Sequence, residues 1–95
     1  MTTERDLIEY LETNLYTLVL ASPLASIESR RRVQVDRARL ARLRVRSIAL
    51  YIAHGAACDT RNRLDANEQL EREGFFSYRQ LLPRMRDRFP DVWVS

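Results

Sequence analysis

The stretch RRRVQVDRARLARLRVR, from Arg30 to Arg46, decides how this chain is expected to fold. It continues without a break into the apolar residues SIALYIAH at positions 47–54. Together they concentrate charge and apolar residues in one amphipathic pattern, which predicts a helix. The other segments are expected to pack around this central basic helix.

Apolar residues of the central helix fall on two stripes when successive residues are placed about 100° apart. The first stripe consists of Val33, Leu40, Leu43, Leu50 and His54. The second stripe consists of Ala38, Ala41, Val45, Ile48, Ala49 and Ile52. Two stripes imply two packing partners. The preceding helix can supply one, and either the C-terminal segment or a second copy of the protein can supply the other.

Arginines occupy the remaining surface of that helix. Arg37 and Arg44 lie between the stripes, where a guanidinium needs a carboxylate partner from this chain or from another. Arg39, Arg42 and Arg46 cluster on the opposite side. These three are the candidate residues for electrostatic docking.

The formal net charge of +3 hides a strong segregation of charge along the chain. Residues 30–46 carry eight arginines and one acid, whereas residues 1–29 carry one arginine and five acids. The acids of the first segment can therefore neutralise part of the basic segment within the chain. All sixteen basic residues are arginine, a bias that a GC-rich genome also explains.

The central helix has two possible lengths. A helix from Pro23 to His54 is about 48 Å long at about 1.5 Å per residue, whereas a domain of this size spans about 30 Å. Either it breaks between Ser26 and Arg30, or it protrudes and meets another chain. Ser22 and Ser26 compete as its N-cap, and Gly55 is the expected C-cap.

An N-terminal helix is predicted from Glu4 to Ala21, because apolar residues recur there at spacings of one, three and four. Its apolar stripe consists of Leu7, Ile8, Leu11, Leu15, Leu18 and Val19. Tyr10 and Tyr16 point off the stripe. The pair Ser22-Pro23 ends the helix, because proline cannot continue the hydrogen-bond ladder.

Two capping boxes predict the helices of the C-terminal part. Asp65 and Glu68 have the spacing of the first, and Gly74 closes the short helix that it starts. Ser77 and Gln80 form the second.

The helix that follows the second box is predicted over residues 78–88. Pro83 lies inside this range, so it is expected to kink the helix or to divide it.

These patterns predict an all-α fold, a single domain over residues 1–95. It is expected to be a small bundle of four to five helices, built on a helical hairpin with a long central basic helix. No run approaches the roughly 18 apolar residues of a membrane span, and the N-terminus MTTERD is acidic where a signal peptide is basic. The expected location is the cytoplasm, without contact to a membrane.

Residues that could carry chemistry are few. His54 and Cys58 are four apart, but a zinc site needs three or four ligands, and the chain has no second histidine or cysteine. Gly55 and Gly74 are the only glycines, so there is no glycine-rich phosphate loop. The expectation is a protein without a catalytic residue, cofactor or metal.

Function is therefore expected to be binding, by a small regulatory or adaptor protein of the kind found among bacterial and phage regulators and inhibitors. The expected partner is a protein with an acidic surface, contacted by Arg39, Arg42 and Arg46. Tyr78, Phe89 and Trp93 are candidate aromatic anchors. The second stripe predicts a homodimer. Two alternatives remain: an arginine face that binds nucleic acid, and one that is only salt-bridged or solvated.

Overall fold

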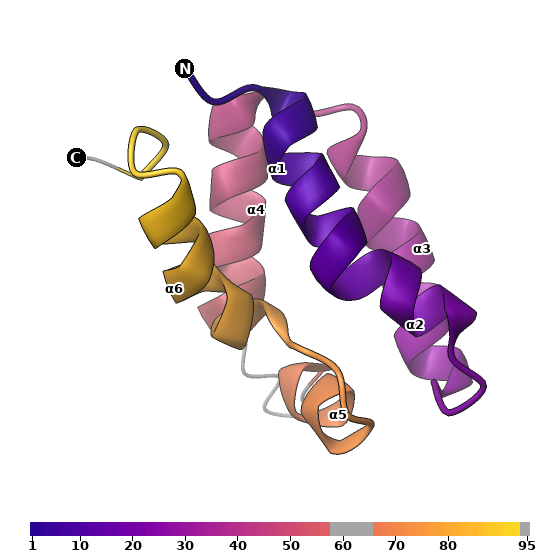
Figure 1. The fold of residues 1–95 in the computed structure, drawn as a ribbon. Helices are drawn as coiled ribbons and strands as arrows, with labels where there is room; N and C mark the ends of the chain where they lie inside the picture. The colour runs from indigo at the N-terminus through magenta and orange to yellow at the C-terminus, as the bar shows by residue number, and fades with distance from the viewer. Residues whose placement is uncertain (58–65, 94–95) are drawn as a thin grey trace.

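The computed structural model describes residues 1–57 and 66–93, and these form a bundle of five helices (Figure 1). The N-terminal helix consists of α1 (Glu4–Leu11), the π-helical turn η1 (Glu12–Tyr16) and α2 (Thr17–Ala21). The others are α3 (Ile27–Leu40), α4 (Val45–Ala57), α5 (Ala66–Arg72) and α6 (Tyr78–Arg88). The prediction of a small all-α bundle of four to five helices is confirmed.

The N-terminal helix and α3 form an antiparallel hairpin, and α4 returns in the direction opposite to α3 (Figure 1). α6 packs on α4, and the short helix α5 lies across one end of the bundle (Figure 1). α3 therefore lies at one edge of the bundle, and α6 lies at the other.

The predicted bounds of the N-terminal helix, Glu4 to Ala21, are confirmed. A capping box starts it, because Thr3 accepts from the Asp6 backbone N–H while the Asp6 carboxylate accepts from Thr3. The guanidinium of Arg30 reaches its other end and donates to the carbonyls of Leu20, Ser22 and Ala25. These bonds fix the turn between α2 and α3.

Because of the π turn, the buried residues of this helix differ from the predicted apolar stripe. Tyr16 was expected to point off the stripe but is fully buried, and Leu18 was expected in the stripe but is 49% exposed. A π turn holds one extra residue, so the residues after it are rotated by about 100° relative to a regular helix. This rotation turns Tyr16 into the core and Leu18 out of it.

The long central helix predicted from Pro23 to His54 is wrong, because the chain forms two helices in that range. α3 begins after the N-cap Ser26, whose hydroxyl accepts from the Ser29 N–H at 3.1 Å. The break lies at residues 41–44, not near Ser26 to Arg30 as expected. Glu4 explains where α4 starts, because its carboxylate accepts from the backbone N–H of Val45 at 3.1 Å. Arg44 is at the N-cap position of α4, and its side chain has no hydrogen-bond acceptor. The Glu4 carboxylate supplies an acceptor at this end of the helix instead.

The break also decides which parts of the two predicted stripes are buried. Ile48, Ala49 and Ile52 of the second stripe are core residues on α4, which packs against α6 and α1. Ala38 and Ala41 are exposed instead, and so are Leu50 and His54 of the first stripe. The C-terminal segment is thus the second packing partner. The second stripe therefore no longer supports the predicted homodimer.

Gly55 does not end α4, which continues to Ala57, so the prediction of a C-cap there is wrong. Gly55 is buried, and a Cβ atom at this position would lie 3.4 Å from the Tyr78 ring. Its role is therefore close packing between α4 and the start of α6.

Gly74 ends α5 as predicted. It has a positive φ of 92°, and the N–H groups of Gly74 and Phe75 donate to Glu71 and Leu70 in a Schellman arrangement. Asp65, the expected N-cap of this helix, lies outside the described residues.

The predicted helix over residues 78–88 is also confirmed, together with its capping box of Ser77 and Gln80. Pro83 does not divide it: α6 is a single helix. None of the described helices combines the length and the apolar character that crossing a membrane requires.

Candidate functional site

The eight arginines of residues 30–46 divide into two groups. Five of them have a partner inside the chain: Arg30, Arg32, Arg37, Arg39 and Arg44. No ion pair, hydrogen bond or ring contact joins the side chains of Arg31, Arg42 and Arg46 to the described residues. Carboxylates neutralise three of the five partnered arginines, Arg32, Arg37 and Arg44, whereas Arg30 binds neutral carbonyls and Arg39 lies over a ring.

Arg37 and Arg44, which the sequence placed between two apolar stripes, take their carboxylates from the N-terminal helix. Arg37 binds Glu12 through both Nε and Nη2, the latter at 3.1 Å. Arg44 binds Glu4 at 3.2 Å. The acid therefore comes from this chain in both cases, and the two pairs tie the N-terminal helix to α3 and to the turn before α4.

A buried hydrogen-bond network surrounds Asp36, which is 1% exposed. Arg32 and Tyr78 donate to Oδ2 of Asp36 at 3.0 and 2.7 Å, and Tyr51 donates to Oδ1 at 2.6 Å. Because the Tyr78 hydroxyl gives its proton to Asp36, the hydroxyl of Tyr16 donates to Tyr78. The network joins the N-terminal helix, α3, α4 and α6.

Burial dominates the electrostatics of this network. It raises the pKa of Tyr78 well above the ordinary value, and Tyr16 and Asp36 raise it further. Burial likewise raises the pKa of Tyr16 and, together with the bond to Asp36, that of Tyr51. For Arg32 burial is the largest single influence and acts to lower the pKa, but the charge and hydrogen bond of Asp36, together with Tyr78 and Tyr51, outweigh it, so the pKa is raised. At neutral pH the tyrosines are protonated and Arg32 is charged.

Sequence reasoning missed this network. The only local signal is the spacing of four between Arg32 and Asp36, which places both on one face of a helix. The tyrosines come from three other elements, so no pattern in the sequence connects them. Because Asp36 is enclosed and each buried polar side-chain atom of the described residues has a partner, the network has no open position for a substrate.

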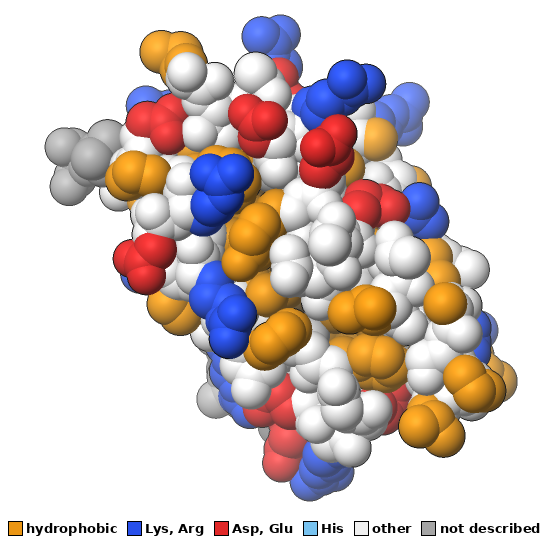
Figure 2. All heavy atoms as spheres, in the orientation of Figure 1, with side chains coloured by type: hydrophobic (Ala, Val, Ile, Leu, Met, Phe, Trp, Pro, Cys, Tyr) orange, Lys and Arg blue, Asp and Glu red, His pale blue; other side chains and the backbone are white. Residues whose placement is uncertain are grey.

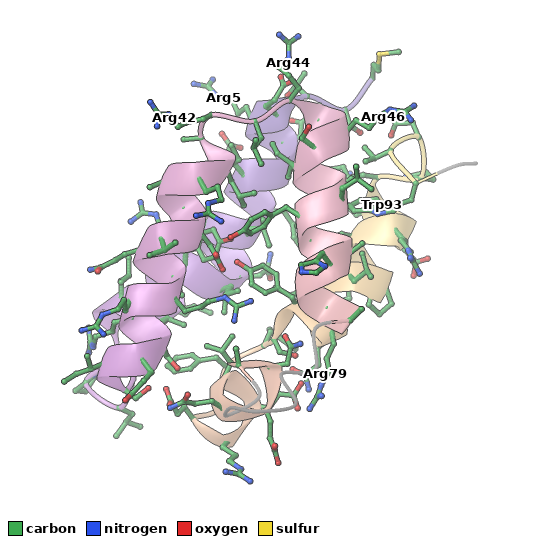
Figure 3. All side chains as sticks on the ribbon, turned by 180° about the vertical axis from the view of Figure 1, so that it is seen from behind. Arg5, Arg42, Arg44, Arg46, Arg79 and Trp93 are labelled. Atoms are coloured by element: carbon green, nitrogen blue, oxygen red, sulfur yellow. The ribbon has the colours of Figure 1, made fainter. Side chains whose placement is uncertain are left out.

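The three arginines predicted for docking do not form one face. Arg39 lies on α3 with its guanidinium over the Tyr51 ring, 5.9 Å from the ring centre. Figure 3 shows Arg42 beside the end of α3 and Arg46 on the opposite side of the view, beyond the start of α4, with Arg44 between them. The helix wheel placed them together only because it assumed a continuous helix.

Two of the three predicted aromatic anchors belong to the core, which corrects that prediction. Tyr78 is 1% exposed and holds Asp36, and Phe89 is 7% exposed and packs edge-on against Tyr10. Tyr78 lies at the start of α6, and Phe89 follows its end. Trp93 is partly exposed and packs against the core.

An exposed stripe on α3 combines apolar residues with an unpaired arginine. Its members follow one another at spacings of four, four and three and fall within about 80° on the helix: Ile27, Arg31, Val35 and Ala38. Ile27 is 70% and Val35 47% exposed. We call these four residues the outer stripe.

The outer stripe continues onto the turn between α2 and α3. Leu24 is 78% exposed there, and its backbone N–H donates to the Ser22 hydroxyl. Figure 2 shows hydrophobic side chains gathered at the corner where this turn lies. Four of the six large exposed apolar side chains in the described residues lie between positions 18 and 35.

A shallow groove lies between α1 and α6, with two adjoining hollows of about 560 and 250 Å³. Both are lined by Asp6, Arg88 and Phe89. Asp6 already caps α1, and Arg88 lies over the Phe89 ring. The groove therefore offers few free polar groups to a ligand.

The pair of His54 and Cys58 cannot be placed, because Cys58 lies outside the described residues. His54 itself is exposed on α4. Within the described part of the chain, no three His, Cys, Asp or Glu side chains are grouped in a way that could hold a metal ion.

No protein-family model matches this chain, and no curated protein or solved structure is significantly similar to it.

Proposed function

We propose that this protein acts by binding another protein, as a small regulatory or adaptor protein without a catalytic step. The observation that carries the proposal is the outer stripe, in which the unpaired Arg31 lies between the exposed Ile27 and Val35. Arginine and apolar side chains that are buried together supply much of the binding energy of protein interfaces. An acidic partner surface fits this stripe best, because the stripe itself contains no acid.

The core supports the same proposal. Its titratable groups hold one another in a closed network around Asp36, so they stabilise the fold and are not offered to a substrate. The residues left for function are those on the surface.

Nucleic-acid binding by the basic segment is the rival proposal, and it has lost much of its support. Five of the eight arginines are engaged within the chain, and the other three lie on separate elements: Arg31 on α3, Arg42 in the turn after it and Arg46 on α4. Anisotropy of labelled duplex DNA at two salt concentrations tests it, since phosphate binding weakens steeply as salt rises. Micromolar binding with a steep salt dependence would favour the rival over the protein partner.

The homodimer remains a prediction, but the second stripe no longer supports it. Sedimentation at micromolar concentration decides it. A monomer mass agrees with the burial of Ile48, Ala49 and Ile52 against α6 and α1.

Affinity capture from the native organism tests the proposed function, with Arg31→Glu compared against the wild type. The matched control is Arg86→Glu, which reverses another exposed arginine, on α6 at the opposite edge of the bundle. We expect a protein that is retained by the wild type and by Arg86→Glu but lost with Arg31→Glu. Retention of the same proteins by all three forms, or of none by the wild type, contradicts the proposal.

A further inference from the structure

We infer that the outer stripe, extended by Leu24, binds an amphipathic helix whose apolar face is flanked by carboxylates. This inference rests on the proposed function and names the chemistry of the partner. It follows from the shape, the rigidity and the charge of the surface around α3.

The shape of the surface suits a helix. Ile27, Arg31, Val35 and Ala38 follow one another along about 16 Å of α3, at the spacings that place residues on one helix face. α3 lies at the edge of the bundle (Figure 1). All four side chains are exposed. Parallel or antiparallel packing of a second helix buries such a row continuously. The small side chain of Ala38 leaves room for a larger residue of the partner.

The turn that presents Leu24 and Ile27 is held from two sides. Arg30 donates to three carbonyls of the turn, at Leu20, Ser22 and Ala25. From α5, Glu73 accepts from the Ser26 N–H at 3.0 Å, and Gln69 donates to the Ser26 hydroxyl at 3.1 Å. The exposed apolar side chains are thus preorganised, which lowers the entropy lost on binding.

Charge selects the partner. Arg31 has no partner in the described residues and lies at the centre of the apolar row, so an occupant must supply a carboxylate opposite it to avoid burying an unpaired charge. Arg42, also unpaired, follows in the turn beyond the end of α3. A second copy of this chain would bring the same arginines to the contact, and its nearest acid, the exposed Glu28, lies beside the stripe, about 20° from Val35 on the helix. The positive stripe therefore favours an acidic helix over self-association.

Two synthetic peptides of about three heptads test this inference. Both carry leucine along one face, and its flanks carry glutamate in one peptide and lysine in the other. Fluorescence anisotropy should show that the glutamate peptide binds at least about tenfold more tightly than the lysine peptide. Equal binding of both peptides, or none of the glutamate peptide, overturns the inference.

Variants locate the binding. Arg31→Glu and Val35→Asp should each weaken binding of the glutamate peptide about tenfold, because each removes a central contact of the stripe. The matched controls, Arg86→Glu and Leu50→Asp, change an exposed arginine on α6 and an exposed leucine on α4 and should leave it within about twofold. Unchanged binding of Arg31→Glu overturns the inference.

Two further measurements separate other occupants of the stripe. Binding to vesicles of phosphatidylcholine and phosphatidylserine that Val35→Asp abolishes would assign the stripe to a membrane and overturn the inference. A dimer in sedimentation that Val35→Asp dissociates would assign it to a second copy, with the same consequence. Affinity capture could retain a protein whose binding depends on Arg31 but that contains no acidic helix. That result would overturn the inferred acidic helix and would leave the proposed function, binding of another protein, standing.

Discussion

Arg31 and Arg32 are neighbours in the sequence, yet they face different surroundings, about 100° apart around α3. Arg32 turns inward, donates to the buried Asp36 at 3.0 Å and lies over the Tyr78 ring, 5.5 Å from its centre. Arg31 turns outward and lies between Ile27 and Val35 without a partner in the described residues. The difference shows that one basic segment performs two tasks. Its inner face holds the helices together, and its outer face is left for a partner.

The largest effect is expected on the inner side, for Asp36→Ala. This change leaves the guanidinium of Arg32 and the hydroxyls of Tyr51 and Tyr78 without their acceptor, which should cost about 3–5 kcal/mol of unfolding free energy. Urea unfolding measures the loss. Asp87→Ala, which removes an exposed carboxylate on α6, is the control and should stay within about 0.5 kcal/mol. Equal stability of the two variants would mean that the network does not hold the bundle.

The same comparison can be made between the two neighbouring arginines. Arg32→Met removes the positive partner of a buried carboxylate and should cost about 2–3 kcal/mol, less than Asp36→Ala because the Arg32 side chain is 30% exposed. Arg31→Met should change the unfolding free energy by no more than about 0.5 kcal/mol. If both variants lose the same stability, the proposed division between the two faces of α3 fails.

Alkaline pH should destabilise only the hydrogen-bond network on the inner side of α3. The pKa values of Tyr16 and Tyr78 are raised in the folded protein, so folding favours their protonated forms. Their contribution is complete below the unfolded pKa of about 10 and is lost as the pH rises above it, at about 1.4 kcal/mol per pH unit for each tyrosine. Absorbance at 295 nm should show both tyrosines ionising only as circular dichroism reports unfolding. Their ionisation in the folded protein is the contrary result.

Among changes to the network around Asp36, the smallest effect is expected for Tyr16→Phe, at about 1 kcal/mol. It removes one hydrogen bond and leaves no buried donor unpaired, because Tyr78 still donates to Asp36. Tyr78→Phe should cost about twice as much, since it also removes the acceptor of the Tyr16 hydroxyl. Urea unfolding of both variants and of the double variant measures their coupling. A larger loss for Tyr16→Phe than for Tyr78→Phe would contradict this order.

Local signals were sufficient to predict much of the fold. The bounds of the N-terminal helix, the capping box of Ser77 and Gln80, and the end of α5 at Gly74 depend on residues close together in the sequence. The break after Leu40 could not be predicted this way, because residues 41–44 read ARLR and contain no helix breaker. Its cause includes Glu4, which binds Arg44 and caps α4 from the far end of the chain.

The candidate site was harder to predict for the same reason. Arg37 and Arg44 have the carboxylate partners that the sequence led us to expect, but not for the expected reason. Their side chains are 44% and 90% exposed, and Arg44 lies in the turn before α4, not between two buried stripes. It grouped Arg39, Arg42 and Arg46 on one face because the wheel was continued through a turn. It could not distinguish Arg31 from Arg32, because only the position of Asp36 and the tyrosines in space separates them.

The π turn at Glu12–Tyr16 makes the network depend on the length of the N-terminal helix as well as on its chemistry. The turn acts as a one-residue insertion that sets the phase of all later residues in that helix. Deleting the exposed Thr13 would remove the extra residue, so a regular helix would keep Tyr16 in the core and Leu18 exposed. A regular helix formed with all the residues retained would instead turn Leu18 inward and carry the Tyr16 hydroxyl away from Tyr78. A shift of phase, with every side chain of the network still present in the chain, would thus disconnect the N-terminal helix from Asp36.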